Sequence, residues 1–287
     1  MKVLVTGGDG QLGTELCRRL EAVGHAAIAF TQKDADFTQA DLLRASIAAQ
    51  RADWVINCAA HTQVDKAESE PELAFAINRD GARAVAEAVA SYGGRLLHLS
   101  TDFIFDGTQS HPYRETDAPH PLGVYGQSKW EGEQAVCAVL PDALIVRTAW
   151  VHGAHGHNFV KTMLRLAAER DELNVVDDQI GTPSWTGDIA AALITLMEQN
   201  AQGCYHFTNE GVASWYDFAV AIIDEARALG FPIKVQRVNP IPSSAYPTPA
   251  RRPAYSVLDK TKIRAALGRP IPHWRESLVT MLRELQP

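Results

Sequence analysis

The sequence predicts an α/β protein built on a doubly wound parallel sheet, with a second and smaller α/β lobe. Short apolar runs alternate with longer segments of helical period through the first half of the chain, as in βαβ units. A glycine cluster separates the first run from the first helical segment. The regular alternation ends near residue 150, so we expect one domain over residues 1–150 and a lobe over residues 151–287 that interleaves with it.

The first domain contains five expected strands and two expected helices. The strands are placed at residues 2–6, 26–30, 53–60, 95–101 and 143–150. Their apolar character is continuous, which is typical of parallel strands covered on both faces. Apolar residues recur at helical spacing from Leu12 to Val23, so we expect a helix that ends at Gly24. A second helix is expected from Pro71 to Ser91, because proline suits a first turn and alanine favours helix.

Beyond residue 150 the alternation is less regular. Helices are expected near residues 158–169, 187–199, 214–229 and 273–285, with short strands near 173–176, 204–208 and 233–238. Residues 239–253 are rich in proline and serine, which disfavour a helix or a central strand. We therefore expect a long loop or linker in that segment.

Composition and charge narrow the classes of protein. With 46% hydrophobic and 21% charged residues, the chain has an ordinary soluble composition, and its apolar runs are shorter than the roughly 20 residues that span a bilayer. The opening MKVLVT is typical of a strand rather than a signal peptide, so we expect a cytoplasmic protein. A net charge of -7 disfavours nucleic acid as a partner and favours a small molecule. The short apolar runs predict no membrane partner, and a homodimer stays possible.

The segment TGGDGQLG, residues 6–13, carries the first chemical signal. It follows a strand and opens a helix, with Gly7, Gly10 and Gly13 at a spacing that brings backbone N–H groups close to a pyrophosphate. A merely structural turn is the alternative. Because of its place at the start of a βαβ series, we interpret the segment as the loop of a Rossmann-like NAD(P)-binding domain.

The choice of cofactor depends on the end of the second strand. A carboxylate there would bond the ribose 2'-hydroxyl of NAD, but the run from Phe30 to Asp34 has no acid at its first positions and has a cation at Lys33. This favours NADPH and leaves NADH open. Asp36 and Phe37 follow in positions that suit the adenine, although a surface carboxylate and a core ring are equally good readings.

Tyr125 and Lys129 are the strongest catalytic candidates. They are spaced i, i+4 at the start of an expected helix, so their side chains share a face. We expect the ammonium to stabilise the phenolate and so to lower the pKa of the phenol. The alternative is that the two side chains lie on an exposed helix face and have no catalytic role. The hydroxyl of Thr101, at the end of the fourth strand, argues for catalysis, because ligands bind beyond the carboxyl ends of parallel strands.

These motifs together resemble the extended, nucleotide-sugar-modifying branch of the short-chain dehydrogenase/reductase superfamily. Further blocks are similar to the dTDP-4-dehydrorhamnose reductase family, in order along the chain. They include GGDGQLG at 7–13, STDFIFDG at 100–107, PLGVYGQSKWEGE at 121–133 and DQIGTPSW at 178–185. The resemblance implies an NAD(P)H-dependent oxidoreductase of dTDP-rhamnose biosynthesis, which reduces the C4 ketone of dTDP-4-dehydro-β-L-rhamnose to dTDP-β-L-rhamnose.

The resemblance also implies roles for individual residues. Tyr125 would be the proton donor, Lys129 would hold the nicotinamide ribose, and Thr101 would bond the reacting oxygen. Thr101, Asp102 and Trp150 would bind the substrate sugar. The cofactor would be bound by Gly7, Gly10, Gln11, Leu12, Gly13, Asp36, Phe37, Ala60, His61, Thr62, Tyr125 and Lys129.

Some positions depart from the family pattern. Phe103 stands where tyrosine is usual, which removes a hydroxyl beside the substrate, and Thr31-Gln32 replaces an acid-arginine pair. The alternatives are another extended nucleotide-sugar reductase or epimerase, or a non-catalytic regulatory subunit resembling that of methionine adenosyltransferase. We predict no metal site, because the histidines of VHGAHGHN lack an adjacent carboxylate and the cysteines form no CxxC pair. The resemblance leaves Mg²⁺ open without a motif that indicates it.

Overall fold

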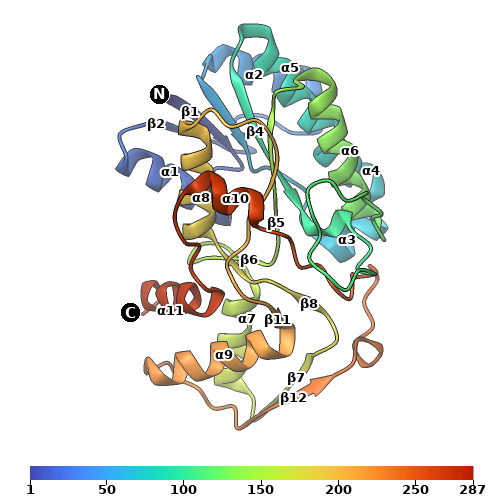
Figure 1. The fold of residues 1–287 in the computed structure, drawn as a ribbon, viewed down its shortest axis with the longest axis vertical. Coiled ribbons are helices and arrows are strands. Elements are labelled where there is room, and N and C mark those ends of the chain that lie inside the picture. Colours follow the sequence, from blue (N-terminus) through green and yellow to red (C-terminus); the bar gives the residue numbers. More distant parts are fainter. Residues whose placement is uncertain (287) are drawn as a thin grey trace.

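The computed structural model describes residues 1–286 and contains the expected doubly wound sheet (Figure 1). Within these residues, six parallel strands lie in the order β10-β5-β4-β3-β1-β2. They are β1 (Lys2–Thr6), β2 (Ala26–Phe30), β3 (Trp54–Asn57), β4 (Arg95–Thr101), β5 (Leu144–Thr148) and β10 (Gly203–His206). The chain reverses direction across the sheet between β1 and β3, and this switch point is where open α/β sheets bind ligands.

Helices cover both faces of this sheet, which explains the continuous apolar runs of its strands. One face packs on α1 (Gln11–Ala22), α8 (Thr186–Glu198) and α10 (Thr261–Leu267). The other packs on α2 (Ala40–Gln50), α5 (Ala82–Tyr92) and α6 (Val124–Val139). Alternate residues of β1 serve the two faces, since Val3 and Val5 join the first core and Leu4 joins the second. The Rossmann-like architecture is therefore confirmed.

The helix expected from Pro71 to Ser91 is present but interrupted. It consists of α4 (Pro71–Phe75), a π-helical segment (Ala76–Gly81) and α5, which ends at Gly93 in the left-handed conformation. Single π-helical turns inside α-helices occur frequently at functional sites. The short helix α3 (Val64–Ser69) precedes this run and lies beside the start of α6.

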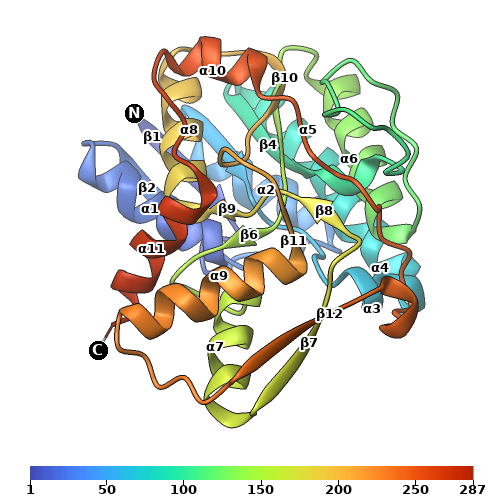
Figure 2. The same ribbon diagram turned by 60° about the horizontal axis from the view of Figure 1, so that its bottom comes forward.

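The lower lobe in Figures 1 and 2 has its own core. It contains α7 (Phe159–Glu169), α9 (Trp215–Ala228) and α11 (Trp274–Glu284), together with the ribbon of β7 (Glu172–Val176) and β12 (Arg237–Ile241). Two short pairs connect the lobe to the sheet: β6 (Val151–His152) with β9 (Ser184–Trp185), and β8 (Ile180–Gly181) with β11 (Ala213–Ser214). The domain division near residue 150 stays a prediction. Two elements from the second half of the chain belong to the first domain, since β10 is a strand of the central sheet and α8 packs on one face of it.

One expected strand was misplaced. The strand predicted at residues 233–238 is β12, which extends into the segment expected to be a loop and includes Pro240. β12 pairs only with β7 among the described strands, so the ring of Pro240 can face the unpaired edge. The strand expected at 53–60 is also shorter, and its last residues form part of a cavity wall instead.

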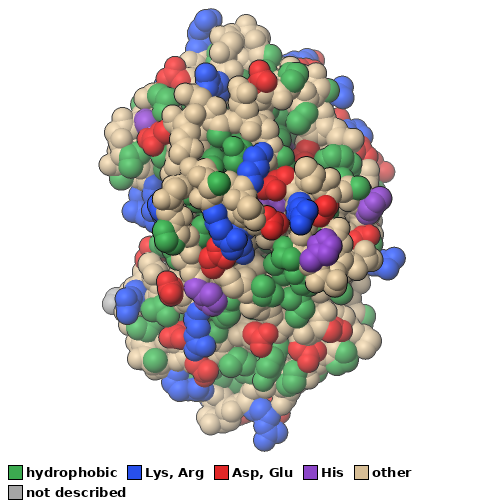
Figure 3. Space-filling model, viewed as in Figure 1, with side chains coloured by type: hydrophobic (Ala, Val, Ile, Leu, Met, Phe, Trp, Pro, Cys, Tyr) green, Lys and Arg blue, Asp and Glu red, His purple; other side chains and the backbone are tan. Residues whose placement is uncertain are grey.

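The outer surface carries charges of both signs. On the face in Figure 3, acidic and basic side chains are interspersed with apolar groups. Across residues 1–286, no helix is long and apolar enough to cross a membrane.

Candidate active site

A cavity of about 660 Å³ opens at the carboxyl ends of the central strands. It brings together every residue predicted to bind cofactor or substrate except His61. The predicted residues that line it are Gly7, Gly10, Gln11, Leu12, Gly13, Asp36, Phe37, Ala60, Thr62, Thr101, Asp102, Tyr125, Lys129 and Trp150. The cavity therefore joins the glycine-rich loop to the Tyr125 and Lys129 pair, as the topology of a parallel sheet requires.

The glycine-rich loop is packed too closely to accept side chains at two positions. Gly7 has a φ of +63°, and a methyl group there would lie 3.0 Å from the backbone nitrogen of Ala59. A methyl group on Gly13 would collide with the carbonyl oxygen of Gly7. Gln11 opens α1, and its side chain accepts a hydrogen bond of 2.9 Å from Asn158. Gln11, Leu12 and Gly13 line the cavity, and they form the first turn of α1, where backbone N–H groups have no partner within the helix.

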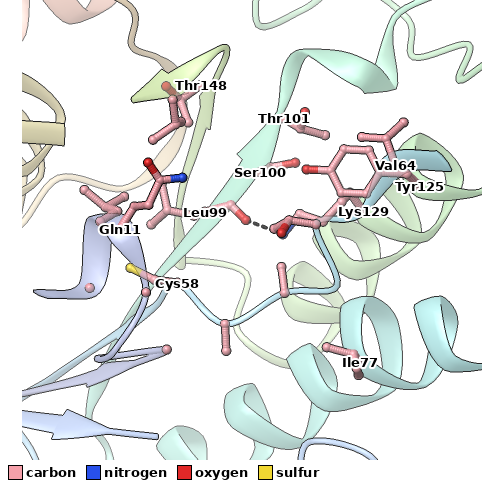
Figure 4. Close-up of a pocket in the computed structure, with 18 of the residues that line it drawn as sticks. Gln11, Cys58, Val64, Ile77, Leu99, Ser100, Thr101, Tyr125, Lys129 and Thr148 are labelled. Carbon is pink, nitrogen blue, oxygen red and sulfur yellow. Dashed lines mark hydrogen bonds between the residues drawn. The ribbon is translucent and has the colours of Figure 1, made fainter. Parts of the chain in front are cut away.

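Tyr125 and Lys129 lie on α6 and converge on the end of β4 (Figure 4). The helix begins after Gly123, and the carboxylate of Glu68 on α3 accepts the N–H of Val124 at 2.8 Å. This carboxylate replaces the side-chain cap that a glycine cannot supply. Lys129 is 3% exposed and donates a hydrogen bond of 2.5 Å to the carbonyl oxygen of Leu99.

The pKa of the phenol contradicts the sequence-based expectation. Burial raises the pKa of Tyr125 to about 12, an effect that the Thr101 hydroxyl partly offsets and the Asp102 carboxylate reinforces. Burial also lowers the pKa of Lys129 to about 8. The expected lowering by Lys129 is wrong, because its ammonium is bound to Leu99 rather than to the phenol. The phenol consequently stays protonated at neutral pH.

A buried asparagine connects the cofactor side of the cavity to the catalytic helix. Asn78, in the π-helical segment, accepts the backbone N–H of His61 at 2.8 Å and donates to its carbonyl oxygen at 3.2 Å. It also donates to the hydroxyl of Ser128 at 2.9 Å, and that hydroxyl donates to the carbonyl oxygen of Tyr125 at 2.9 Å. Asn78 was not predicted from the sequence, although a polar residue inside an alanine-rich helix can indicate a buried hydrogen-bonding role.

His61 differs from the expectation. Its side chain is 8% exposed and is absent from the described lining of the cavity, and its Nε2 atom lies 3.8 Å from a carboxylate oxygen of Glu70. The bonds to Asn78 use its backbone. The predicted contact between His61 and a cofactor therefore stays a prediction. Only the backbone of His61, which lies between the lining residues Ala60 and Thr62, is placed to make it.

Thr101 and Asp102 border the cavity opposite the glycine-rich loop. The Thr101 hydroxyl donates to a carboxylate oxygen of Asp102 at 3.1 Å and accepts the N–H of Phe103 at 3.2 Å. Asp102 is 1% exposed, and burial raises its pKa to about 6 although the hydroxyls of Ser256 and Thr101 lower it. The ring of Phe103 packs edge-on against that of Tyr125, with 5.5 Å between centroids. Phe103 thus packs against the phenol ring of Tyr125 and brings no hydroxyl to the cavity.

We expect the Asp102→Asn variant to be more stable than the unmodified protein at pH 7. The folded-state pKa of Asp102 is raised, so the folded protein binds more protons than the unfolded chain between about pH 4 and pH 6. This group's contribution to stability therefore falls as pH rises through that window, by at most about 3 kcal/mol at 1.36 kcal/mol per pKa unit. Chemical denaturation at pH 4 and pH 7 measures the difference.

Asp106 provides a matched control with the opposite sign. Hydrogen bonds from the backbone N–H of Thr108 and from nearby hydroxyls hold the pKa of Asp106 below its usual value. Asp106→Asn should therefore lower stability at pH 7. If Asp102→Asn also lowers stability at pH 7, the folded protein stabilises the charged carboxylate of Asp102, and the predicted rise in its pKa is wrong.

The part of the cavity beyond β2 is lined by Gln32, Asp36 and Phe37. Asp36 lines it, and its carboxylate accepts the N–H and hydroxyl of Thr38, both at 2.8 Å. Among the described residues of segment 30–34, only Gln32 lines the cavity. The carboxylate of Asp34 turns back to accept the backbone N–H of Thr31 at 2.7 Å. Within residues 30–34, an amide rather than an acid therefore lines the cavity.

Several cavity residues were not among the predicted site residues, although Phe103 was expected beside the substrate and Gln32 lies in the segment expected to decide the choice of cofactor. They are Asp9, Gln32, Cys58, Ala59, Val64, Ile77, Leu99, Ser100, Phe103, Thr148, Ala149, Val151, His157 and Asn158. Asn158 had a usable signal, since asparagine before a helical stretch is a typical N-cap, and it caps α7 here. Over residues 1–286, no cluster of three or more histidine, cysteine or acidic side chains is arranged to hold a metal ion.

Comparison with known proteins identifies the family. The model of the RmlD substrate binding domain matches residues 1–287. A dTDP-4-dehydrorhamnose reductase from Aggregatibacter actinomycetemcomitans is 45% identical, over 96% of this chain and 97% of that protein. The crystal structure of a dTDP-4-dehydrorhamnose reductase from Clostridium acetobutylicum is 40% identical with a TM-score of 0.94 and covers 100% of both chains. Another, from Bacillus anthracis in complex with NADP, is 37% identical with a TM-score of 0.93 and covers 99% of both. The chain belongs to the dTDP-4-dehydrorhamnose reductase family.

Proposed function

We propose that this chain reduces the C4 ketone of dTDP-4-dehydro-β-L-rhamnose to the alcohol of dTDP-β-L-rhamnose, with NADPH as reductant. The relatives named as dTDP-4-dehydrorhamnose reductases support the substrate, and the Bacillus anthracis complex supports the cofactor. One observation carries the chemistry: the protonated phenol of Tyr125, the Thr101 hydroxyl and the Lys129 ammonium share one cavity with the glycine-rich loop.

The residues of the cavity fit a dinucleotide. The N–H groups of Gln11 and Leu12 at the start of α1 would bind the pyrophosphate, because the positive end of the helix dipole lies there, and Gly10, whose own N–H is bonded to Gly7, would let the backbone approach it closely. Asp36 and Phe37 would flank the adenosine. Ala60 and Thr62, with the backbone of His61, would lie along the middle of the cofactor.

In the proposed mechanism the chain supplies a proton and orients the reacting groups. Bound NADPH supplies the hydride that reduces the carbonyl carbon. As negative charge develops on the carbonyl oxygen, Tyr125 transfers its phenolic proton to that oxygen. The hydroxyl of Thr101 would turn from Asp102 to donate a hydrogen bond to the same oxygen. Lys129 would hold the nicotinamide ribose through its ammonium. Tyr125 then recovers a proton from solvent, which balances the conversion of ketone to alcohol.

The sugar would be enclosed by side chains from both halves of the chain. Asp102 would accept hydrogen bonds from sugar hydroxyls, and Trp150 would provide an apolar face against the ring. Asp102 is mainly ionised at pH 7, because its raised pKa of about 6 still lies below that value. Its buried carboxylate is therefore available as an acceptor.

The preference for NADPH is supported by the segment after β2. The neutral amide of Gln32 would not repel a nearby 2'-phosphate, as a carboxylate would. The next residue, Lys33, adds a positive charge to the same segment. Asp34 is held by Thr31 and lies outside the lining of the cavity within the described residues. NADH remains the alternative reductant.

We expect the protein to oxidise NADPH when dTDP-4-dehydrorhamnose is added, in a one-to-one ratio of NADP⁺ to dTDP-rhamnose. The loss of nicotinamide absorbance and chromatography of the sugar nucleotide measure the two products. An epimerase would retain its nicotinamide and convert the sugar without net oxidation. A regulatory subunit would bind NADPH without turnover, and either result contradicts the proposal.

A cytoplasmic location and a homodimeric assembly also belong to this proposal. Cell fractionation and analytical ultracentrifugation of the full chain test them separately from the reaction. The domain division near residue 150 is likewise a proposal, to be tested by limited proteolysis.

A further inference from the structure

The wall of the cavity contains a tryptophan in an unusual backbone conformation. Trp150 has a φ of +46°, in the left-handed region that bulky residues rarely adopt. It directly follows the residue pair Thr148 and Ala149, which also line the cavity. Such a conformation persists only where the surroundings hold it in place, and it occurs frequently at ligand sites.

The indole of Trp150 is fixed by two groups of the lower lobe. Its ring stacks on that of Trp215, with 3.5 Å between centroids and 5° between planes. Its edge lies against Gly181, where a methyl group would come within 2.6 Å of the Trp150 ring. Trp150 lines the cavity, whereas Trp215 is outside the lining within the described residues. Trp215 therefore covers one face of the Trp150 indole without itself lining the cavity.

Trp215 is itself held by well-defined local structure. It is the first residue of α9 and lies inside the capping box that Ser214 and Asp217 form. Ser214 belongs to β11, which pairs with β8 (Figures 1 and 2), so that Ala213 lies opposite Gly181 and Ser214 lies opposite Ile180. The ring of Phe159 packs on Trp215, with 4.7 Å between centroids. Three aromatic rings thus connect the cavity wall to the core of the lower lobe.

We propose that Trp215 is a positioning residue that fixes the indole of Trp150 against the substrate sugar. This inference rests on the proposed function, because it assigns to Trp150 a face against the sugar. A ring backed by a rigid partner needs no reordering when the sugar binds, which lowers the cost of binding. Trp215 would then determine affinity for the nucleotide sugar although it does not contact it. The cofactor, which occupies the side of the glycine-rich loop, would be unaffected.

The test compares two substitutions of Trp215 in the full-length protein. Trp215→Leu should raise the KM for dTDP-4-dehydrorhamnose about tenfold, the equivalent of one aromatic pair. Its Kd for NADPH should be unchanged by fluorescence titration. Trp215→Phe keeps a ring beneath Trp150 and should restore most of the affinity. Near-ultraviolet circular dichroism would report the loss of the indole stack in both variants.

A matched control separates positioning from general packing. Phe218→Leu alters the same core, since Phe218 is 1% exposed and packs on Phe159 and Trp274 without stacking on Trp150. It should lower the Tm and leave the KM for the sugar nucleotide unchanged. If Phe218→Leu raises this KM as much as Trp215→Leu does, Trp215 contributes only stability and the proposal fails.

A double substitution tests whether Trp215 acts through Trp150. In a Trp150→Leu background, Trp215→Leu should raise the KM little further, because the effects of coupled residues are not additive. Full additivity contradicts the proposal. Turnover of the sugar by the unmodified protein is measured first: its absence refutes the proposed function, whereas normal turnover with an unchanged KM in Trp215→Leu refutes only the role of Trp215.

Discussion

Tyr125→Phe should lower kcat by roughly 10² or more and leave the affinity for NADPH nearly unchanged. The substitution keeps the ring, which packs against Phe103, and removes the proton that the carbonyl oxygen receives. Since the pKa of the phenol lies at about 12, we also expect the unmodified protein to lose no activity through ionisation of Tyr125 below about pH 10. Steady-state kinetics from pH 6 to pH 10 measure both effects.

Tyr113→Phe is the matched control for this prediction. Tyr113 is buried, and its hydroxyl donates a hydrogen bond of 2.8 Å to Asp106, outside the cavity. Removing that hydroxyl should lower stability without a comparable fall in kcat. Near-normal turnover in Tyr125→Phe would exclude the phenol as the proton donor.

Lys129→Met should weaken NADPH binding by roughly 10- to 10²-fold, since a hydrogen bond to a charged group contributes about 1.5 to 3 kcal/mol. It should also lower kcat, because the same ammonium orients the nicotinamide ribose in the proposed mechanism. Burial lowers the pKa of Lys129 to about 8, so the folded state disfavours its charge. Replacing it with an apolar side chain should therefore leave the Tm unchanged or higher.

Lys260→Met separates the loss of a buried ammonium from the loss of a cofactor contact. Lys260 is 5% exposed and donates a hydrogen bond of 3.0 Å to the carbonyl oxygen of Asn209, away from the cavity. Its substitution should leave the Kd for NADPH unchanged. An unchanged Kd in Lys129→Met would remove the ribose contact from the mechanism.

The sequence was sufficient to predict the sheet because its signals are local. β1, β2 and β4 lie at the expected residues, since continuous apolar runs bounded by turns specify buried parallel strands. The catalytic candidates were also predictable, because the order of strands in such a sheet brings the ends of β1, β3 and β4 together. The i, i+4 spacing of Tyr125 and Lys129 predicts a catalytic pair only in combination with that topology.

Features that depend on tertiary packing were not predictable. The direction of the pKa shift of Tyr125 depends on burial and on the hydrogen bond that takes the Lys129 ammonium towards Leu99. The role of Asn78 depends on a π-helical turn and on partners 17 and 50 residues away. Likewise, β12 includes Pro240 because it has a partner on one side only. Local propensity carries no information about such partners.

Hydride transfer to the sugar tests the central claim most directly. The protein is mixed with dTDP-4-dehydrorhamnose and with NADPH that carries deuterium at the transferred position of the nicotinamide, and the sugar nucleotide is examined by NMR and mass spectrometry. We predict one deuterium per dTDP-rhamnose, located at C4, with one NADP⁺ formed for each. Deuterium at another carbon, a converted sugar without deuterium, or NADPH that remains unoxidised would contradict the proposed reduction.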